Sequence, residues 1–338
     1  RNAGEGADRG MTKKVTVNQV EYELGDYELS DVEKENLKKV ASTFENTIVV
    51  LNVGGVIDTK FFEETEGLDS LLLMGQGGQE GGNALLDVVT GAVTPSGKLT
   101  DTWAENYSDY PASATFAKAD GDSMKEWYKE GIYVGYRYFE TAAADGFIDY
   151  DTTVQYPFGY GLSYTTFEQT LEDVTCDGTT ITATVNVKNT GNTAGKEVVE
   201  IYYKAPYTPG GIEKSEVVLG GFAKTESLKP GKSEKVTVTM ALEDMASYDY
   251  SGIKAKGGAY VLEAGDYEIR LQSDSHNVID SRTITVDKDV IYNDNNDGKR
   301  SSDQITATNL FDDVTYGENI TYISRADWAG TVPTKRAA

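Results

Sequence analysis

Apolar residues recur with two different periods along the chain, and the change of period divides it into regions. From residue 30 to about residue 45 they lie three and four positions apart. Ser30 and Glu33 form a capping-box pattern at the start of this segment, which predicts a helix. The continuous β-branched run over 47–53 is typical of a strand buried on both faces of a parallel sheet. The same reasoning predicts a short helix over 57–66, a buried strand over 71–74 and a helix over 83–90.

Helices that alternate with strands in this way are typical of an α/β domain with a parallel sheet. Glycines follow both predicted strands, as the pair Gly54 and Gly55 and as the run 75–82. Ligands of open α/β sheets bind beyond these strand ends, but the run lacks the Gly-Lys-Ser/Thr ending of a phosphate-binding loop. We expect these glycines to permit close packing of strand and helix, with a ligand contact by Gln76 or Glu80 as the alternative.

From about residue 170 apolar and polar residues alternate, so the period becomes two. Turn residues separate the alternating segments, and 205–216 is expected to form one long loop between strands. This pattern predicts an antiparallel β-sandwich. His276 stands alone near its end and is expected on the surface. The clearest strand segments are 180–187, 197–203, 236–240 and 267–271.

Two further stretches follow neither period. The segment 92–168 is rich in aromatic residues and turns, and we expect it to be irregular and attached to a domain by buried rings. We expect Arg137 to be a buried hydrogen-bonding centre, with a substrate ligand as the alternative. Residues 293–298 resemble the start of a calcium loop, but the position that should carry its last acidic ligand is Gln304. The final stretch, which includes Trp328, is too apolar to remain free in solvent.

Charge and rare residues limit the possible functions. The net charge of −24 and the isoelectric point near 4.4 argue against binding to nucleic acid or to an anionic membrane surface. The single cysteine, Cys176, cannot form an internal disulfide, and the single histidine argues against His-based metal sites and Ser-His-Asp chemistry. No apolar run approaches the roughly 20 residues that a membrane helix needs. Any catalysis would therefore run on carboxylates.

The first nine residues hold the candidate for such a carboxylate. Glu5 lies between two glycines, which would let a bulky ligand approach it closely. Asp8 and Arg9 follow, and they are well spaced to hold the loop through charge-assisted hydrogen bonds. The alternative is that these residues form a frayed chain end.

Seven strings together resemble glycoside hydrolase family 3, which includes β-glucosidases and β-xylosidases. Their order and rough spacing fit the family from residue 1 to about residue 285. The strings are 4–9 (Gly-Glu-Gly-Ala-Asp-Arg), 78–82, 94–99, 130–138, 158–165, 189–198 and 219–222.

The resemblance implies a catalytic barrel with an aspartate nucleophile and an α/β sandwich that supplies a glutamate acid/base. Glu5 matches that acid/base, and Asp8 and Arg9 match the pair that anchors its loop. No nucleophile string is present, and the nearest segment, 326–328 (Ala-Asp-Trp), has the wrong surroundings. The first half of the α/β domain is also absent, and the chain continues past the β-sandwich. This resembles members with permuted domain order, in which the barrel follows a fibronectin type III-like domain.

The expected fold class is thus α/β plus all-β, in three parts. A partial α/β sandwich domain with the acid/base loop spans 1–168, a fibronectin type III-like β-sandwich spans 169–287, and an extended linker toward a missing barrel spans 288–338. We expect part of a retaining, exo-acting β-glucosidase that is inactive alone. The expected partners are a β-linked glucoside or oligosaccharide and the remainder of the enzyme, on another segment or chain; no cofactor is expected.

Two other functions stay open at this point. One is a β-xylosidase or another β-glycosidase of the same family, and the other is a non-catalytic carbohydrate-binding or adhesive protein. A nucleotide-binding oxidoreductase is a distant third, because no dinucleotide fingerprint is present. The sequence leaves localisation open between the cytoplasm and secretion, and it leaves the sugar specificity and the oligomeric state open.

Overall fold

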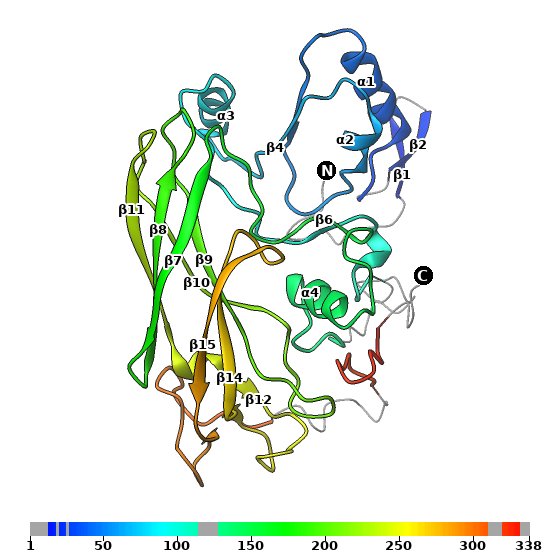
Figure 1. Ribbon diagram of the computed structural model, residues 1–338. Coiled ribbons are helices and arrows are strands. Elements are labelled where there is room, and N and C mark those ends of the chain that lie inside the picture. Colours follow the sequence, from blue (N-terminus) through cyan, green and yellow to red (C-terminus); the bar gives the residue numbers. More distant parts are fainter. Residues whose placement is uncertain (1–12, 18–19, 25–26, 114–127, 310–319, 332–338) are drawn as a thin grey trace. The chain divides into compact units, whose positions relative to one another are not determined.

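The computed structural model describes residues 13–17, 20–24, 27–113, 128–309 and 320–331, and Figure 1 shows their course. These residues belong to two compact units. The first unit draws on Arg1–Val93, Trp103–Glu126 and Asp151–Tyr156, and the second on Thr94–Thr102, Trp127–Tyr150 and Pro157–Ala338. The domain boundaries expected at residues 168 and 287 stay predictions.

The first unit contains the expected α/β elements in the expected order. Strands β3 (Ile48–Leu51) and β4 (Ser70–Leu73) pair in parallel, with Ile48 opposite Ser70 and Leu51 opposite Leu73. The helices that accompany them are α1 (Asp31–Ala41), α2 (Lys60–Glu64) and α3 (Gly81–Val89). The unit also holds an antiparallel hairpin of β1 (Lys13–Val17) and β2 (Val20–Leu24), and an antiparallel pair of β5 (Trp103–Ala104) and β6 (Val154–Tyr156).

Local side-chain chemistry starts α1 as the sequence predicts. The Ser30 hydroxyl accepts a hydrogen bond from the Glu33 amide at 3.3 Å, and the Glu33 carboxylate accepts one from the Ser30 amide at 2.8 Å. Two amide groups that the helix itself leaves without partners are satisfied in this way. The helix ends at Ala41, four residues before the predicted end.

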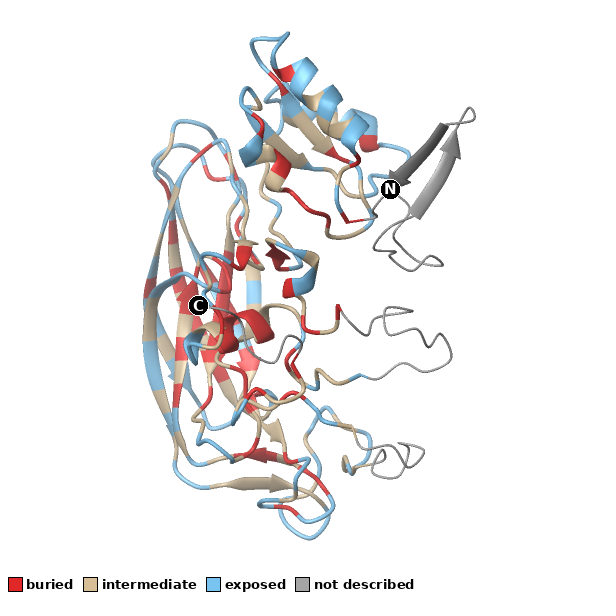
Figure 2. Cartoon of the chain, turned by 90° about the vertical axis from the view of Figure 1, so that its right-hand side faces the viewer, coloured by how far each residue is buried: buried red, intermediate tan, exposed pale blue. Residues whose placement is uncertain are grey.

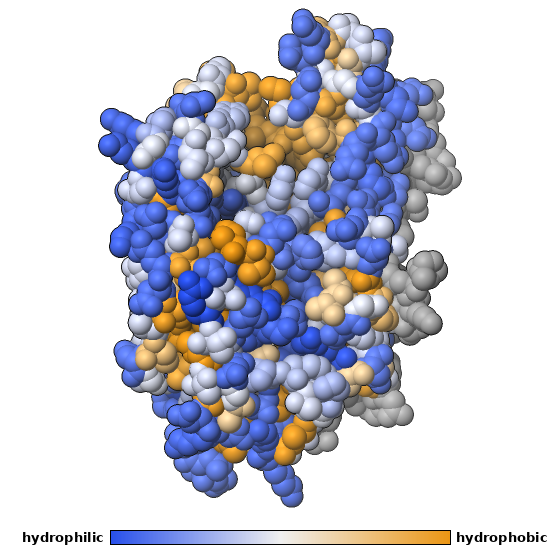
Figure 3. Space-filling model, viewed as in Figure 1, coloured by the Kyte–Doolittle hydropathy of each residue, from blue (hydrophilic) through white to orange (hydrophobic). Residues whose placement is uncertain are grey.

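Burial of the parallel sheet differs from the expectation of two covered faces. Ile48 is 47% exposed and Leu73 is 42% exposed. The reason is the size of the sheet, because β3 and β4 pair with no third strand in the part of the chain that the structure describes. Apolar side chains consequently reach the surface, and Figure 3 shows orange atoms gathered where Figure 1 draws α3 and β4.

The second unit is the predicted antiparallel β-sandwich. Its two sheets have the strand orders β11–β8–β7 and β10–β9–β14–β15. Side chains such as Val185, Ile201 and Ile269 are fully buried between them, and Figure 2 shows buried positions along these strands. The strands are β7 (Phe167–Cys176), β8 (Thr180–Asn189), β9 (Val198–Lys204), β10 (Val218–Lys224), β11 (Ser233–Ala241), β14 (Gly265–Gln272) and β15 (Val278–Val286).

A helix packs on this sandwich where the sequence predicts irregular structure. It is α4 (Tyr136–Ala144), whose residues Tyr138, Phe139 and Ala142 are fully buried. The Tyr136 ring stacks on Phe158 with centroids 4.6 Å apart, and its hydroxyl accepts a hydrogen bond from the Leu219 amide at 2.9 Å. The expectation of buried rings is therefore confirmed, and the expectation of irregular backbone is wrong for α4.

The segment after the sandwich is packed against the second unit rather than free. A small sheet joins β12 (Ser247–Tyr248), β13 (Tyr260–Leu262) and β16 (Val290–Tyr292). Further along, Trp328 is 6% exposed and stacks on Phe147 with centroids 5.2 Å apart. The amide of Ile323 donates a hydrogen bond to the Lys129 carbonyl at 2.9 Å. The apolar pattern of the tail is explained by these contacts.

Candidate functional site

The proposed acid/base Glu5 and the proposed loop-anchoring pair Asp8 and Arg9 lie outside the described residues. Their roles stay predictions. Other candidate sites lie among the described residues: the glycine-rich end of β4, several charged clusters and one cavity.

The glycines that follow β4 pack tightly around one side chain. A Cβ atom on Gly81 would lie 2.8 Å from the Met74 methyl carbon, and one on Gly77 would lie 2.9 Å from it. Any larger residue would force Met74 to move, because real Cβ atoms do not approach other atoms so closely. Gly77 and Gly81 therefore permit close packing between the end of β4 and α3, whereas a Cβ atom on Gly75, Gly78 or Gly82 would meet nothing within 4 Å.

The two residues of this run that were considered as ligand contacts both lie at the surface. The Glu80 carboxylate accepts a hydrogen bond from the Asn83 side-chain amide at 2.6 Å, across the first turn of α3. Glu80 thus has a local role at the start of the helix, and Gln76 faces solvent.

A charged cluster in the first unit joins α2 to the segment after β5. The Lys60 ammonium donates hydrogen bonds to the Glu105 carbonyl at 2.9 Å and to the Asn106 side chain at 2.8 Å, and it lies 3.8 Å from the buried Asp58 carboxylate. Burial, and next the charge of Glu63, raise the pKa of the Glu105 carboxyl. The lysine holds two chain segments together, which is a structural role.

His276 lies at the surface, as the sequence predicts, but it is not isolated. Its Nδ1 atom lies 2.8 Å from the buried Glu140 carboxylate, and its ring stacks on Tyr150 with centroids 3.6 Å apart. The same carboxylate accepts hydrogen bonds from the Tyr150 and Ser275 hydroxyls, each at 2.7 Å. Burial, followed by the charge of Glu140, raises the pKa of Tyr150. The cluster fastens α4 to the turn between β14 and β15.

The arginine at the centre of a hydrogen-bond network is Arg325, not Arg137. Arg137 is half-buried, and within the described residues its guanidinium makes no hydrogen bond or ion pair. The Arg325 side chain is 8% exposed and forms two-pronged hydrogen bonds with Asp145 at 2.9–3.1 Å and an ion pair with Glu216 at 3.0 Å. The sequence signal that could have identified Arg325 is that it is the one arginine in the apolar segment 320–331.

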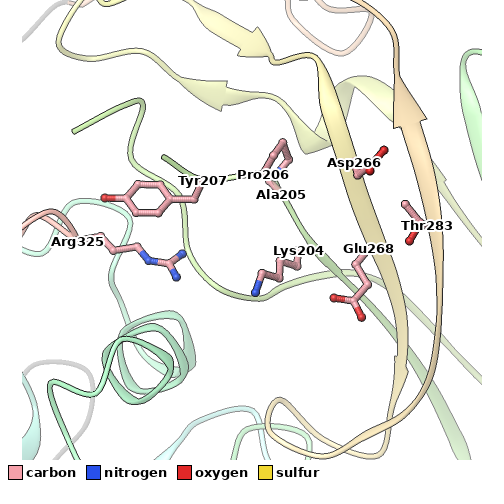
Figure 4. A pocket seen from close by; sticks show the side chains of 8 residues that line it. All are labelled: Lys204, Ala205, Pro206, Tyr207, Asp266, Glu268, Thr283 and Arg325. Carbon is pink, nitrogen blue, oxygen red and sulfur yellow. The ribbon is translucent and has the colours of Figure 1, made fainter. Parts of the chain in front are cut away.

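A cavity of about 360 Å³ opens on the second unit, and sequence reasoning missed it. Figure 4 shows three apolar or aromatic residues of the chain after β9 on one side and three polar residues of β14 and β15 on the other. The Lys204 side chain lies between them, and the Arg325 side chain lies beside Tyr207. The remaining lining residues are Ala205, Pro206, Tyr207, Asp266, Glu268 and Thr283.

The oxygen-rich turn 293–298 uses its side chains to hold its own backbone. Asn293 accepts a hydrogen bond from the Asn295 amide at 3.0 Å, and Asp297 accepts one from the Ile291 amide at 2.9 Å. The Asp294 carboxylate accepts a hydrogen bond from the Thr306 hydroxyl at 2.6 Å. Over the described ranges, no three His, Cys, Asp or Glu residues are grouped so that they could hold a metal ion.

None of the described helices has both the length and the apolar character needed to cross a membrane.

Two family models match the chain. Residues 1–136 match the glycosyl hydrolase family 3 C-terminal domain, and residues 197–275 match the fibronectin type III-like domain. The matched domains agree with the expected fold class, an α/β region followed by a fibronectin-like β-sandwich.

Curated relatives with similar sequences carry names of glycosidases. β-Glucosidase A of Butyrivibrio fibrisolvens is 42% identical over 299 residues, which is 80% of this chain and 34% of the relative. A β-glucosidase of Ruminococcus albus is 43% identical over 264 residues, 78% of this chain and 26% of the relative. An exo-α-(1→6)-L-arabinopyranosidase of Bifidobacterium longum is 36% identical over 258 residues, 75% of this chain and 31% of the relative. The chain spans about a third or less of the length of these relatives.

Solved structures give the same picture. A β-glucosidase from Paenibacillus barengoltzii superposes with a TM-score of 0.71 at 36% identity, over 84% of this chain and 30% of that one. β-Glucosidase 3B from Thermotoga neapolitana, in complex with α-D-glucose, also gives 0.71, at 37% identity over 86% of this chain and 37% of that one.

Proposed function

We propose, from the premise that this chain belongs to glycosyl hydrolase family 3, that it forms part of a retaining β-glucosidase. The observation that supports this proposal best is the 42% identity over 299 residues with a relative named β-glucosidase A. A β-xylosidase or another β-glycosidase of the family is the alternative. The relative named for α-L-arabinopyranoside cleavage supports keeping the sugar open, because relatives of similar identity carry different substrate names.

In this proposal Glu5 is the general acid/base. Retaining glycosidases place two carboxyl groups about 5–5.5 Å apart, and one attacks the anomeric carbon while the other protonates the leaving oxygen. Glu5 would protonate the oxygen and then take a proton from the water that releases the sugar. This role needs a raised pKa, which burial or the charge of a nearby nucleophile provides. The reaction needs no metal or organic cofactor.

Asp8 and Arg9 are proposed to hold the Glu5 loop in place. A carboxylate and a guanidinium can each form hydrogen bonds to backbone groups as well as to one another, so the pair can fix a glycine-rich turn that would otherwise move. They act on position and not on the reacting atoms.

The aspartate nucleophile is proposed to come from the remainder of the enzyme, on another segment or chain. The support is that the chain spans 34% and 26% of the length of two β-glucosidase relatives. The exposed apolar residues Ile48, Leu73 and Leu86 of the first unit also favour a covering partner, since a parallel sheet is normally covered on both faces.

The test is Glu5→Gln in the complete enzyme, measured on two substrates. Glutamine cannot donate a proton to the leaving oxygen, so hydrolysis of a β-glucoside with a poor leaving group should fall about 10²- to 10⁴-fold. An activated aryl glucoside should suffer much less in its glycosylation step, because its leaving group needs little protonation.

Glu45→Gln is the matched control, because Glu45 is an exposed glutamate of the same unit. It should leave both rates unchanged. Equal losses of Glu5→Gln on the two substrates, or no loss on either, would count against Glu5 as the acid.

A further inference from the structure

We propose that the cavity on the β-sandwich is a second binding site, which takes a neutral sugar unit of an oligosaccharide. The cavity is lined by residues of β9, β14, β15, the chain after β9 and the segment 320–331, all in the second unit. Its volume of about 360 Å³ lies within the range of small-molecule sites. The choice of a glucose-type sugar rests on the proposed function.

The lining divides into an apolar side and a polar side. Ala205, Pro206 and Tyr207 are consecutive and form the apolar side, and Asp266, Glu268 and Thr283 face them in Figure 4. A pyranose ring has the same division, with C–H groups on its faces and hydroxyl groups around its rim. Aromatic rings and aliphatic side chains bind the former, and carboxylates and hydroxyls bind the latter.

The charges of the lining favour a neutral ligand. Lys204 and Arg325 contribute two positive charges, and Asp266 and Glu268 contribute two negative charges. With the ion-paired Arg270, Glu216 and Asp145, the whole cluster holds three positive and four negative charges, so the two signs nearly balance. An anion would meet the two carboxylates, and a cation would meet the ammonium and the guanidinium. Hydroxyl groups can donate to the carboxylates and accept from the cations, so a polyhydroxylated neutral molecule satisfies both kinds of group.

The groups that would hold the sugar are fixed before it arrives. The Arg325 guanidinium lies 4.4 Å from the centre of the Tyr207 ring, and Glu216 holds both Arg325 at 3.0 Å and the Lys204 ammonium at 2.5 Å. Glu268 accepts a hydrogen bond from Arg270 at 2.7 Å. Such preorganisation lowers the entropy that binding would cost.

Two lining side chains are still open to solvent. Asp266 and Thr283 are exposed, and they lie on neighbouring strands of the sheet. The Asp266 Oδ1 atom accepts a hydrogen bond from the Thr285 hydroxyl at 2.6 Å, which leaves Oδ2 for a ligand. Their oxygens can replace hydrogen bonds to water by hydrogen bonds to sugar hydroxyls without breaking the ion pairs of Glu216. The polar side of the cavity thus combines fixed charges with free hydrogen-bonding capacity.

The experiment titrates the 338-residue chain with glucose and with a β-1,4-linked glucose tetramer, and follows backbone amide signals by NMR. Signals of Lys204, Ala205, Tyr207 and residues 266–268 should shift in a saturable way, with the tetramer binding at least as tightly as glucose. Tyr207→Ala should weaken binding about tenfold or more, and Asp266→Ala several-fold, because each removes one side of the site. Asp266 is exposed, so this second variant tests the proposal even where Tyr207→Ala perturbs the fold.

Phe222→Ala is the control, because Phe222 is an exposed aromatic residue of the same unit that does not line the cavity. It should change the affinity less than twofold. No saturable shift, or binding that survives both cavity variants, would overturn the proposal. Either result would leave the acid/base proposal for Glu5 untouched, since that one is tested by leaving-group dependence in the complete enzyme.

Discussion

Glu200 on β9 shows at the scale of one residue how burial controls a charge. It is 4% exposed and accepts a hydrogen bond from the Tyr202 hydroxyl at 2.7 Å. Burial raises its pKa to about 7 from an ordinary value of 4.5, although the Tyr202 hydrogen bond and the charge of Lys98 act in the opposite direction. A Cβ atom on Gly159 would lie 2.4 Å from this carboxylate, so only glycine fits beside it.

The raised pKa predicts that Glu200 destabilises the fold as pH increases. Below about pH 4.5 the group is protonated in both the folded and the unfolded chain, and the penalty is absent. Between pH 4.5 and 7 the unfolded chain ionises first, so the folded chain loses up to about 3 kcal/mol of unfolding free energy. Glu200→Gln should therefore match the original chain at pH 4.5 and exceed its stability by roughly that amount at pH 8.

Denaturant unfolding across this pH range checks the prediction. The exposed Glu45→Gln serves as the reference for removing one negative charge from a strongly acidic chain. A stability difference for Glu200→Gln that does not change with pH would show that the carboxyl ionises normally.

Among the elements, α1 and α4 show which structure could be predicted from the sequence. The start of α1 depends on Ser30 and Glu33, three positions apart, so the information is local. α4 depends on partners far along the chain, including the amides of Glu216 and Leu219 that donate hydrogen bonds to Thr141 and Tyr136. Its apolar residues alone do not reveal these partners.

The two candidate sites differ in the same way, because the sequence signal for one is local and the residues of the other are far apart in the chain. Glu5 could be singled out because its neighbours form a short continuous string, whereas the cavity residues come from segments up to about 120 positions apart, from Lys204 to Arg325. Period-two alternation places Glu268 on a strand and ends one residue before Lys204, and no pattern along the chain brings Arg325 to them.

The segment 320–331 contributes one large buried ring, that of Trp328, to the second unit. Trp328 packs on Phe147, Tyr133 and Tyr138, with ring centroids 5.2–5.9 Å apart. Trp328→Ala should lower the unfolding free energy of the second unit by about 3–5 kcal/mol, because it leaves a cavity among buried rings.

Urea unfolding followed by circular dichroism measures this loss. Tyr322→Ala, in the same segment but 38% exposed, is expected to cost less than about 1 kcal/mol. Equal effects of the two substitutions would contradict the prediction that the buried Trp328 ring makes the larger contribution to the stability of the second unit.

For the whole molecule, we expect the chain by itself to lack glucosidase activity. The purified 338-residue chain should release no product from an activated aryl β-glucoside, because we propose that the nucleophile comes from the remainder of the enzyme. A complete β-glucosidase of the family, assayed in parallel, shows that the conditions support turnover. Measurable hydrolysis by the purified chain, abolished by a glucosidase inhibitor, would contradict the prediction.

The packed tail has a consequence for anyone who divides this protein for expression. The match to the fibronectin type III-like model ends at residue 275, before the edge strand β15 and before Trp328. A clone cut there would lose one strand of the four-stranded sheet and would uncover the rings of Phe147, Tyr133 and Tyr138. Such a fragment should aggregate, so a workable boundary for the sandwich lies beyond residue 331.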